Sequence, residues 1–344
     1  MSTNGSTSTT RTRDAAGRPA RLALQAIERF GLDLAGRRVY TEAASNAFAW
    51  TALTAALAGA EVTAETRDSR FGTADAVEAE TQRLARALGV ARRIRVVRAP
   101  DRAALADADV VTNLGFVRPI STEKVGWLKD GAVICLMWEP WEYRPGDLDL
   151  AACRARNIPV LGTNERDPLL RTFRSVGLLA VKLLMEQGVE LLGCHVAVLG
   201  GGHFAGEARL CLEALGALVT VADTPGALPP REGEGLPALD AVVCLEHERH
   251  DLLLAGPGGV LDTARPLPDG LPVMHVCGLL DADAARYAGC TVHPERPAAP
   301  GTMSFTTAHL GPKPVIDLHA AGLRVGQAWL DNDQQTLARL SLPL

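Results

Sequence analysis

The sequence predicts an α/β protein of two domains, each with a parallel β-sheet, joined by a long helix and closed by a C-terminal helix. Three observations predict this class. The chain has 344 residues, enough for two separate cores. Short apolar runs typical of buried strands alternate with segments of helical spacing in both halves of the chain. A glycine-rich turn joins a strand to a helix, but only in the second half.

Composition narrows the classes of function. Hydrophobic residues make up 47% of the chain and charged residues 22%, which is ordinary for a globular protein. The formal net charge of −5 predicts no basic face, so we expect no nucleic-acid partner. No apolar run approaches about 18 residues, so we expect no membrane span. The seven cysteines show no paired C-x-x-C spacing and no H-E-x-x-H motif occurs, which predicts a reduced, cytoplasmic protein without a metal site.

The first half of the chain predicts a substrate domain over 19–165, to which 315–344 returns. Residues 1–18 are rich in Ser, Thr and Arg and predict a disordered tail. Apolar runs predict strands at 37–42, 61–65, 94–98, 108–113, 132–137 and 159–162. Helical spacing predicts helices at 22–30, 74–88, 121–128 and 147–156, and a further helix that ends at 57 and is capped by Ser45 or Asn46.

The second half predicts another α/β domain over 166–314. A helical run over 167–187 would connect the two domains. Apolar runs predict strands at 195–199, 218–222, 241–245, 272–277 and 291–293. Helical spacing over 314–330 predicts the helix that returns to the first domain.

The stretch 194–223, CHVAVLGGGHFAGEARLCLEALGALVTVAD, has the order strand, glycine turn, helix, strand, acid. This order is typical of a Rossmann unit that binds a dinucleotide at the helix N-terminus. Asp223 can accept hydrogen bonds from a ribose diol and would repel a 2′-phosphate, so NAD is favoured over NADP. The alternative is a glycine-rich turn that binds no cofactor. The predicted cofactor-binding residues are Gly200, Gly202, His203, Phe204, Ala205, Asp223 and Gly278.

A second stretch, 128–165, resembles a segment of the D-2-hydroxyacid dehydrogenase and S-adenosylhomocysteine hydrolase superfamily. The matching positions are Asp147, Asp149, Ile158, Val160 and Asn164. The resemblance covers about 110–290 and implies two Rossmann-like domains that bind NAD, with the reaction in the cleft between them. The catalytic sets of both families are missing: HVCGLLD after residue 274 has no Arg, and LLRTFRSVG agrees with the hydrolase only at Gly177.

Histidines are the candidates for proton transfer, because their ordinary pKa lies near neutrality. We expect His275 or His247 to serve, with Glu246 orienting the ring of His247, and His293 as a second candidate. The alternatives are a core histidine bonded to backbone at 275, a solvated loop at 247 and turn chemistry at 293.

Polar residues that follow strands of the first domain predict the substrate side. They are Glu42, Asn46, Asn113 and Trp138. Arg171 and Arg174, three apart at the start of the connecting helix, would share a face and bind an anionic group. The alternatives are a solvated helix start for the arginines and core packing for Trp138.

The resulting hypothesis is an NAD-dependent oxidoreductase acting on a small polar, carboxylate-bearing substrate, in a biosynthetic pathway and as a homodimer. Because the Arg-Glu-His set is missing, the substrate is expected not to be a simple 2-hydroxy acid. Two alternatives stay open. One is a hydrolase-like enzyme whose retained NAD passes through an internal redox cycle, and the other is a nucleotide-binding protein without catalysis.

Overall fold

The computed structural model describes residues 17–228 and 238–344, and the chain divides into two compact units. Unit 1 comprises Met1–Leu170 and Gly311–Leu344, and unit 2 comprises Arg171–Leu310. The first 16 residues of the expected disordered tail lie outside the described residues. Its last two, Gly17 and Arg18, instead begin the first described helix.

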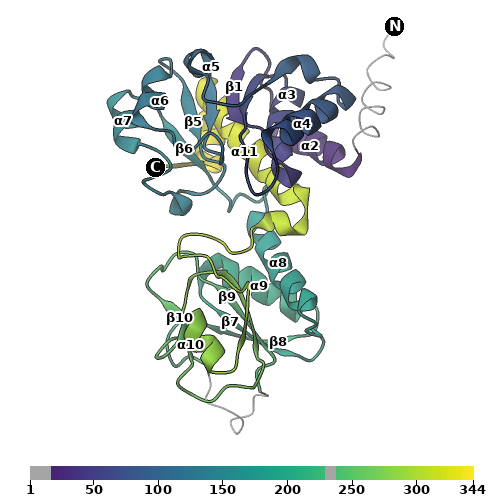
Figure 1. Cartoon of the computed structure of the whole chain (residues 1–344), viewed down its shortest axis with the longest axis vertical. Helices are drawn as coiled ribbons and strands as arrows, with labels where there is room; N and C mark the ends of the chain where they lie inside the picture. Colours follow the sequence, from purple (N-terminus) through teal and green to yellow (C-terminus); the bar gives the residue numbers. More distant parts are fainter. Residues whose placement is uncertain (1–16, 229–237) are drawn as a thin grey trace. The chain divides into compact units, whose positions relative to one another are not determined.

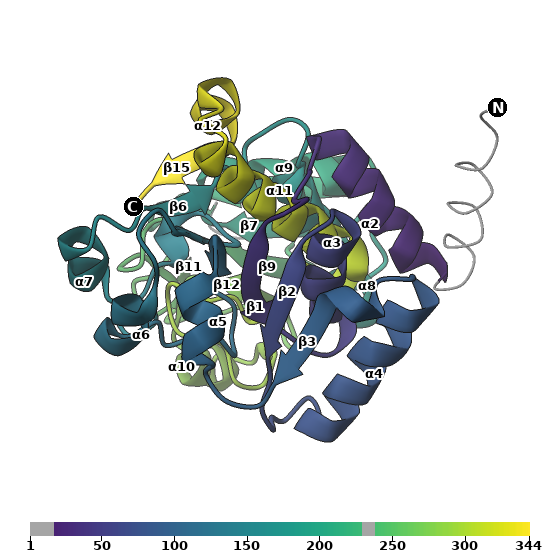
Figure 2. The same cartoon turned by 90° about the horizontal axis from the view of Figure 1, so that it is seen from above.

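Unit 1 contains a seven-stranded sheet in the order β15-β6-β5-β4-β1-β2-β3 (Figures 1 and 2). The strands are β1 (Arg38–Glu42), β2 (Glu61–Glu65), β3 (Ile94–Val97), β4 (Val110–Thr112), β5 (Val133–Cys135), β6 (Val160–Thr163) and β15 (Ser341–Pro343). All neighbours pair in parallel except β15, which is antiparallel to β6. The chain winds outward from β1 to β3 and then crosses back to β4. The strand order therefore reverses between β1 and β4, which is where ligands bind in doubly wound sheets.

Helices cover this sheet. They are α2 (Gly17–Phe30), α3 (Trp50–Leu57), α4 (Ala74–Ala87), α5 (Arg102–Asp107), α6 (Thr122–Trp127), α7 (Leu150–Ala155), α11 (Pro312–Leu330) and α12 (Gln334–Leu340), with short 3₁₀ turns η1 (Asn46–Ala49), η2 (Ala91–Arg93) and η3 (Pro140–Glu142). The expected cap at the start of η1 is wrong: Ser45 precedes it but makes no side-chain cap hydrogen bond, and Asn46 has a positive φ of 56°.

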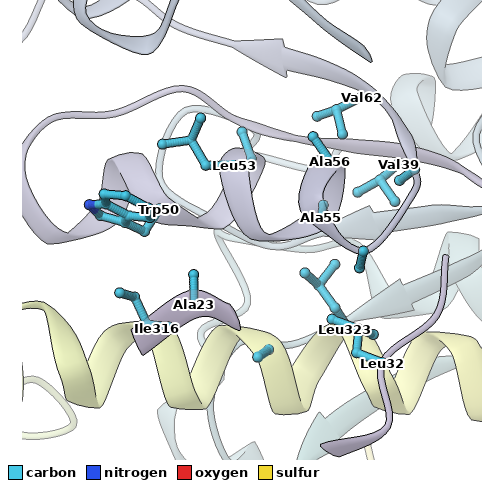
Figure 3. Packing of buried hydrophobic residues seen from close by; sticks show 14 of the residues in the cluster. Ala23, Leu32, Val39, Trp50, Leu53, Ala55, Ala56, Val62, Ile316 and Leu323 are labelled. Carbon is cyan, nitrogen blue, oxygen red and sulfur yellow. The ribbon is translucent and has the colours of Figure 1, made fainter. Parts of the chain in front are cut away.

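Helix α11 is the central helix of unit 1 and packs against α2, α3 and β5. Figure 3 shows Ala23 of α2, Trp50 and Leu53 of α3, and Ile316 and Leu323 of α11 in one buried cluster. Because α11 is buried on several sides, its one histidine, His319, is also buried, and its Nδ1 lies 2.6 Å from Thr51 Oγ1.

Unit 2 contains a five-stranded parallel sheet in the order β14-β12-β9-β7-β8 (Figure 1). Its strands are β7 (His195–Leu199), β8 (Leu218–Ala222), β9 (Ala241–Leu245), β12 (Pro272–Cys277) and β14 (Thr291–His293). The helical elements are α8 (Thr172–Glu186), α9 (Gly202–Glu213), α10 (Ala282–Tyr287) and η4 (Thr307–Leu310). A small second sheet joins β11 (Leu261–Asp262), β10 (Leu253–Gly256) and β13 (Leu279–Leu280).

The predicted fold class is confirmed: both units are α/β with parallel sheets. The main correction concerns the connecting helix, which begins at Thr172 rather than at residue 167. The buried Asp167 holds a turn there, because its Oδ1 accepts the Leu169 N–H at 2.8 Å and its backbone oxygen accepts the Leu170 N–H at 2.9 Å. Within 17–228 and 238–344, no helix is long and apolar enough to cross a membrane.

Candidate functional site

The glycine turn follows β7, at the reversal point of the unit 2 sheet between β7 and β9. Gly200 has φ +122°, and a Cβ atom there would lie 2.7 Å from the backbone oxygen of Leu245, the last residue of β9. Only glycine fits between the two strand ends. Gly202 has φ +65° and begins α9, whose start carries no side-chain cap. The N-terminal turn of this 12-residue helix therefore presents N–H groups where a pyrophosphate binds in Rossmann units.

Asp223 directly follows β8, as the sequence predicted, and it is exposed. The sequence analysis missed the residue beside it, Arg249. One guanidinium nitrogen of Arg249, Nη1, donates to the Asp223 backbone oxygen at 3.0 Å, and Nη2 lies 3.8 Å from Asp223 Oδ2. The same Nη2 lies 3.1 Å from where a Cβ on Gly201 would be. Arg249 thus places a positive charge over the glycine turn.

Glu246 lies under this arginine and is 2% exposed. Its carboxylate accepts the N–H groups of Gly201, Glu248 and Arg249 at 3.3, 3.0 and 3.1 Å. It also accepts Nε and Nη2 of Arg249 at 2.9 and 2.6 Å. Burial alone would raise the pKa of Glu246, but these donors more than offset it and hold the pKa below its usual value.

The expected pairing of Glu246 with the His247 ring is therefore wrong, since Arg249 and the backbone take up the carboxylate. The His247 ring is buried and stacks on Phe204, with ring centroids 4.0 Å apart. Phe173 of α8 contacts Phe204 edge-on and stacks on His203 at 5.4 Å. His247 consequently belongs to an aromatic cluster behind the glycine turn and not to a solvated loop. His203 is exposed at the turn itself.

His275 is fully buried in β12, and both ring nitrogens have partners. Its Nδ1 lies 2.7 Å from Ser304 Oγ and its Nε2 lies 2.9 Å from the Gly278 backbone oxygen. The Gly278 oxygen can only accept, so Nε2 carries the proton and donates to it, and Nδ1 of the neutral ring accepts from the Ser304 hydroxyl, whose oxygen accepts the Ala298 N–H at 2.8 Å. Burial lowers the pKa of His275, so the ring is neutral. His275 is therefore a core histidine bonded to backbone, which was the alternative to a role in proton transfer.

His293 and Gly278 follow or end strands on the other side of β9 from the glycine turn. His293 ends β14, the outermost strand, and β12 and β9 separate it from β7. At about 4.8 Å per strand this is roughly 14 Å across the sheet. Burial also lowers the pKa of His293. Gly278 follows β12 with φ +113°, and a Cβ atom there would lie 3.2 Å from the Glu246 backbone oxygen.

The polar candidates of unit 1 gather at its own reversal point. Glu42 ends β1 and is 5% exposed. Its Oε2 accepts the Phe116 N–H, from the loop after β4, at 3.0 Å. Burial raises the pKa of Glu42 to about 7, although the Phe116 N–H and the cations of Arg118 and Arg67 act in the opposite direction.

The other unit 1 candidates have structural partners. Asn113 is buried and its Oδ1 accepts the Met137 N–H at 2.8 Å, which ties the β4 loop to the end of β5. Trp138 is half-buried, and the guanidinium carbon of Arg118 lies 4.9 Å from the centre of its ring. Asn46 is exposed and begins η1, the 3₁₀ turn that follows β1.

The predicted arginine pair does not share a helical face. Arg171 has a left-handed backbone, φ 54° and ψ 32°, and precedes the first residue of α8. Arg174 lies within α8, and its Nη1 is 3.5 Å from Glu207 Oε2 of α9. Among the residues that the structure describes, no group of three or more His, Cys, Asp or Glu side chains is placed to hold a metal ion.

These two sheets, each with a strand-order reversal and one with a glycine turn, define a protein of two Rossmann-like domains. No family model matches the chain, and no curated protein sequence does. The chain is similar to solved structures of dipicolinate synthase chains from Bacillus halodurans and Bacillus subtilis. The identities are 14% and 13%, the TM-scores 0.55 and 0.51, and the matches cover 86% and 90% of this chain and 99% of each of the others.

A further similar structure is assigned to the NAD-binding D-isomer specific 2-hydroxyacid dehydrogenases, from Polaromonas. It is 18% identical, with a TM-score of 0.46, over 81% of this chain and 98% of that one. The likeness to the two dipicolinate synthase chains confirms the predicted fold of two Rossmann-like domains.

Proposed function

We propose that the protein is an NAD-dependent oxidoreductase that transfers hydride to or from a small, polar, carboxylate-bearing substrate. The observation that carries this proposal is the glycine turn: Gly200 and Gly202 lie at the strand-order reversal of a parallel sheet, at the start of α9, with Asp223 after the next strand. A fold shared with dehydrogenases and reductases supports the same class of reaction.

The residues at the turn fit a dinucleotide. The N–H groups at the start of α9 would hold the pyrophosphate, with His203 beside it, and the Asp223 carboxylate would accept hydrogen bonds from the adenosine ribose. Arg249 would offset the repulsion between these phosphates and the two carboxylates nearby. The bound dinucleotide would supply the hydride acceptor or donor, while the chain itself must bind the substrate and exchange its proton.

Calorimetric titration with NAD⁺, NADH and NADPH tests the proposal. We expect NADH to bind and Asp223→Ala to weaken that binding by about tenfold, the loss of roughly one hydrogen bond to a charged acceptor. Asp240→Ala is a matched control, because this aspartate of unit 2 precedes β9 and its Oδ2 accepts the His195 N–H at the opposite strand end. If no dinucleotide binds the wild-type protein, the proposed function is wrong.

A second candidate is a dinucleotide-binding protein without catalysis. The engagement of both His275 nitrogens favours it, because the histidine that the sequence favoured for proton transfer has both ring nitrogens bonded to protein groups. This candidate predicts dinucleotide binding without turnover on any hydroxy or oxo acid.

Three further parts of the hypothesis remain proposals. A homodimer is expected and is tested by light scattering. The cytoplasm is the proposed compartment, where the seven free and buried cysteines would stay reduced. A biosynthetic reaction is proposed because two of the similar structures are chains of a synthase.

A further inference from the structure

The reversal point of the unit 1 sheet brings a glutamate and two arginines together. Glu42 ends β1, and the loop after β4 carries Gly115, Phe116 and Arg118. Gly115 passes so close that a Cβ atom on it would lie 3.3 Å from Glu42 Oε2 and 3.9 Å from Arg118 Nη2. Open α/β sheets bind ligands at this position, beyond the carboxyl ends of the two strands where the order reverses.

A neighbouring glutamate shows how Glu42 differs from a structural acid. Glu65 ends β2 and is the register partner of Glu42, so both side chains lie on the same face of the sheet. Glu65 Oε2 accepts the Tyr40 hydroxyl at 2.8 Å and lies 3.9 Å from Lys124 Nζ, so it has a buried cation and a donor of its own. Glu42 is hydrogen-bonded by backbone N–H groups, and within the described residues no cationic side chain forms an ion pair with its carboxylate within 4 Å. The positive charges of Arg118 and Arg67 lower its pKa from a greater distance.

The two arginines are held in place around Glu42. Arg67 of the loop after β2 donates Nη2 to the backbone oxygens of Gly115 and Arg118 at 3.1 and 3.2 Å, which fixes the loop that faces Glu42. Arg118 is bound on one side by Asp147 Oδ2 at 2.6 Å from Nη1 and lies over the Trp138 ring. A planar guanidinium has five N–H donors, so Arg118 retains donors for a second carboxylate.

We propose that Glu42 is the proton-transfer group of a carboxylate-binding site at the β1–β4 reversal, with Arg118 binding the carboxylate of the ligand. This inference deepens the proposed function and rests on it, because the ligand would be the oxidoreductase substrate. An ionised Glu42 oxygen would accept the proton of a hydroxyl group on this ligand, and a protonated Glu42 would return it.

The protonation of Glu42 supports this role. A carboxyl group with a pKa near 7 exists in both forms at neutral pH, which is the condition for efficient proton transfer in either direction. The charged and titratable groups around Glu42 and Arg118 are Arg67, Asp147, Glu65, Lys124, Tyr40 and Glu142. The pKa of Glu142 is also raised to about 7, so Glu142→Gln is tested beside Glu42→Gln and should keep the pH dependence described below.

Oxalate is a suitable probe, because it resembles a small oxygenated acid, undergoes no hydride transfer and stays fully ionised across neutral pH. Calorimetry would measure its binding without dinucleotide between about pH 6 and 8.5. Since ionised Glu42 repels the anion, we expect the dissociation constant to rise by about tenfold per pH unit above 7, with uptake of one proton per oxalate bound. In Glu42→Gln the affinity should not change with pH, and Arg118→Gln should weaken binding by at least tenfold.

Glu61→Gln is the matched control, because Glu61 begins β2 at the opposite edge of the same sheet and should leave oxalate binding unchanged. The proposal is overturned if wild type does not bind oxalate at tens of millimolar, if its affinity does not vary with pH, or if Glu42→Gln retains the pH dependence. NADH titration of the same proteins distinguishes a failure of the proposed function from a failure of this inference. Absent NADH binding in wild type contradicts the proposed function, whereas normal NADH binding with a failed oxalate result contradicts only this inference.

Discussion

Each of the two large sheets has a buried glutamate at the point where its strand order reverses, but the pKa values of the two glutamates are shifted in opposite directions. In unit 2, Glu246 receives three backbone N–H groups and two nitrogens of Arg249, and its pKa is lowered. In unit 1, Glu42 receives the Phe116 N–H, and its pKa is raised to about 7. Both side chains are nearly inaccessible to solvent, but the Glu42 carboxyl lies deeper in the protein and receives fewer donors, and both differences raise its pKa above that of Glu246.

The opposite pKa shifts suit the two glutamates to different roles. Glu246, whose lowered pKa favours the ionised form, holds Arg249 above the glycine turn, which suits a site for a phosphate-bearing cofactor. A carboxyl group that titrates near neutral pH suits proton exchange with a substrate.

Replacing Gly200 should produce the largest effect. The Gly200→Ala methyl group would lie 2.7 Å from the Leu245 backbone oxygen, in a backbone with φ +122° that L-residues avoid. Crowding and backbone strain together predict a loss of about 4 kcal/mol in the free energy of unfolding, along with the loss of NADH binding. Chemical denaturation and calorimetry would measure the two effects.

The control for this variant is Gly206→Ala in the middle of α9, where a Cβ atom meets nothing within 4 Å. It should raise the free energy of unfolding by up to about 1 kcal/mol, because alanine favours a helix over glycine. Equal stability of the two variants would show that the turn is not constrained as described.

Glu42→Gln should change how stability depends on pH. A carboxyl group whose pKa rises on folding binds its proton more tightly in the folded state. Its contribution is therefore fully present at low pH and is lost as pH rises from the unfolded pKa near 4.3 through the folded pKa of about 7. The loss amounts to roughly 3 kcal/mol, which the Gln variant should not show.

Glu142 of η3 is a second glutamate whose effect on the pH dependence of stability can be compared with that of Glu42. Burial raises the pKa of Glu142 to about 7 as well, so it should contribute a slope of similar size over the same pH range. Glu42→Gln and Glu142→Gln should each remove a loss of up to about 1.4 kcal/mol per pH unit in this range, and the two changes should add in the double variant. The comparison is made against wild type, because the buried His319, whose pKa is lowered to about 3, contributes a slope of opposite sign. A slope unchanged by Glu42→Gln would mean that Glu42 is ionised in the folded protein at pH 5.

Arg249→Leu should leave the Glu246 carboxylate buried without its cation. Loss of a buried partner costs about 3–5 kcal/mol, but the Arg249 side chain is 41% exposed, so we expect about 2 kcal/mol and weaker NADH binding. Adding Glu246→Gln to this variant should recover most of the stability. Arg265→Leu, which removes a more exposed ion pair with Asp262, should cost less than about 0.5 kcal/mol.

The sequence predicted the features that are encoded locally. Strands such as β7 and β9 are buried on both faces and so appear as apolar runs, and the glycine turn and Asp223 lie within one short segment. The sequence did not predict β10 and β11, because they lie in one glycine-rich stretch, LLLAGPGGVLD over 252–262, or β13, which has only two residues. The C-terminal strand β15 was also missed, since its Pro343 argues against a strand except at a sheet edge, where β15 lies.

The roles of the candidate residues depended on contacts that sequence spacing does not show. The partner of Glu42 is 74 positions away, and the hydroxyl that engages His275 is 29 positions away. The pairing of Glu246 with Arg249 could have been predicted, because the acid and the arginine lie three residues apart in the polar run after β9. That spacing at the end of a strand was the signal that could have identified Arg249.

Hydrogen exchange with and without NADH, followed by mass spectrometry, tests most directly the claim that the dinucleotide belongs to unit 2 and the titrating acid to unit 1. We predict slower exchange in peptides covering 199–214 and 246–249 when NADH is bound, and unchanged exchange in peptides covering β1 and 113–118. Protection confined to the unit 1 peptides, or no protection in either unit at saturating NADH, would contradict the account.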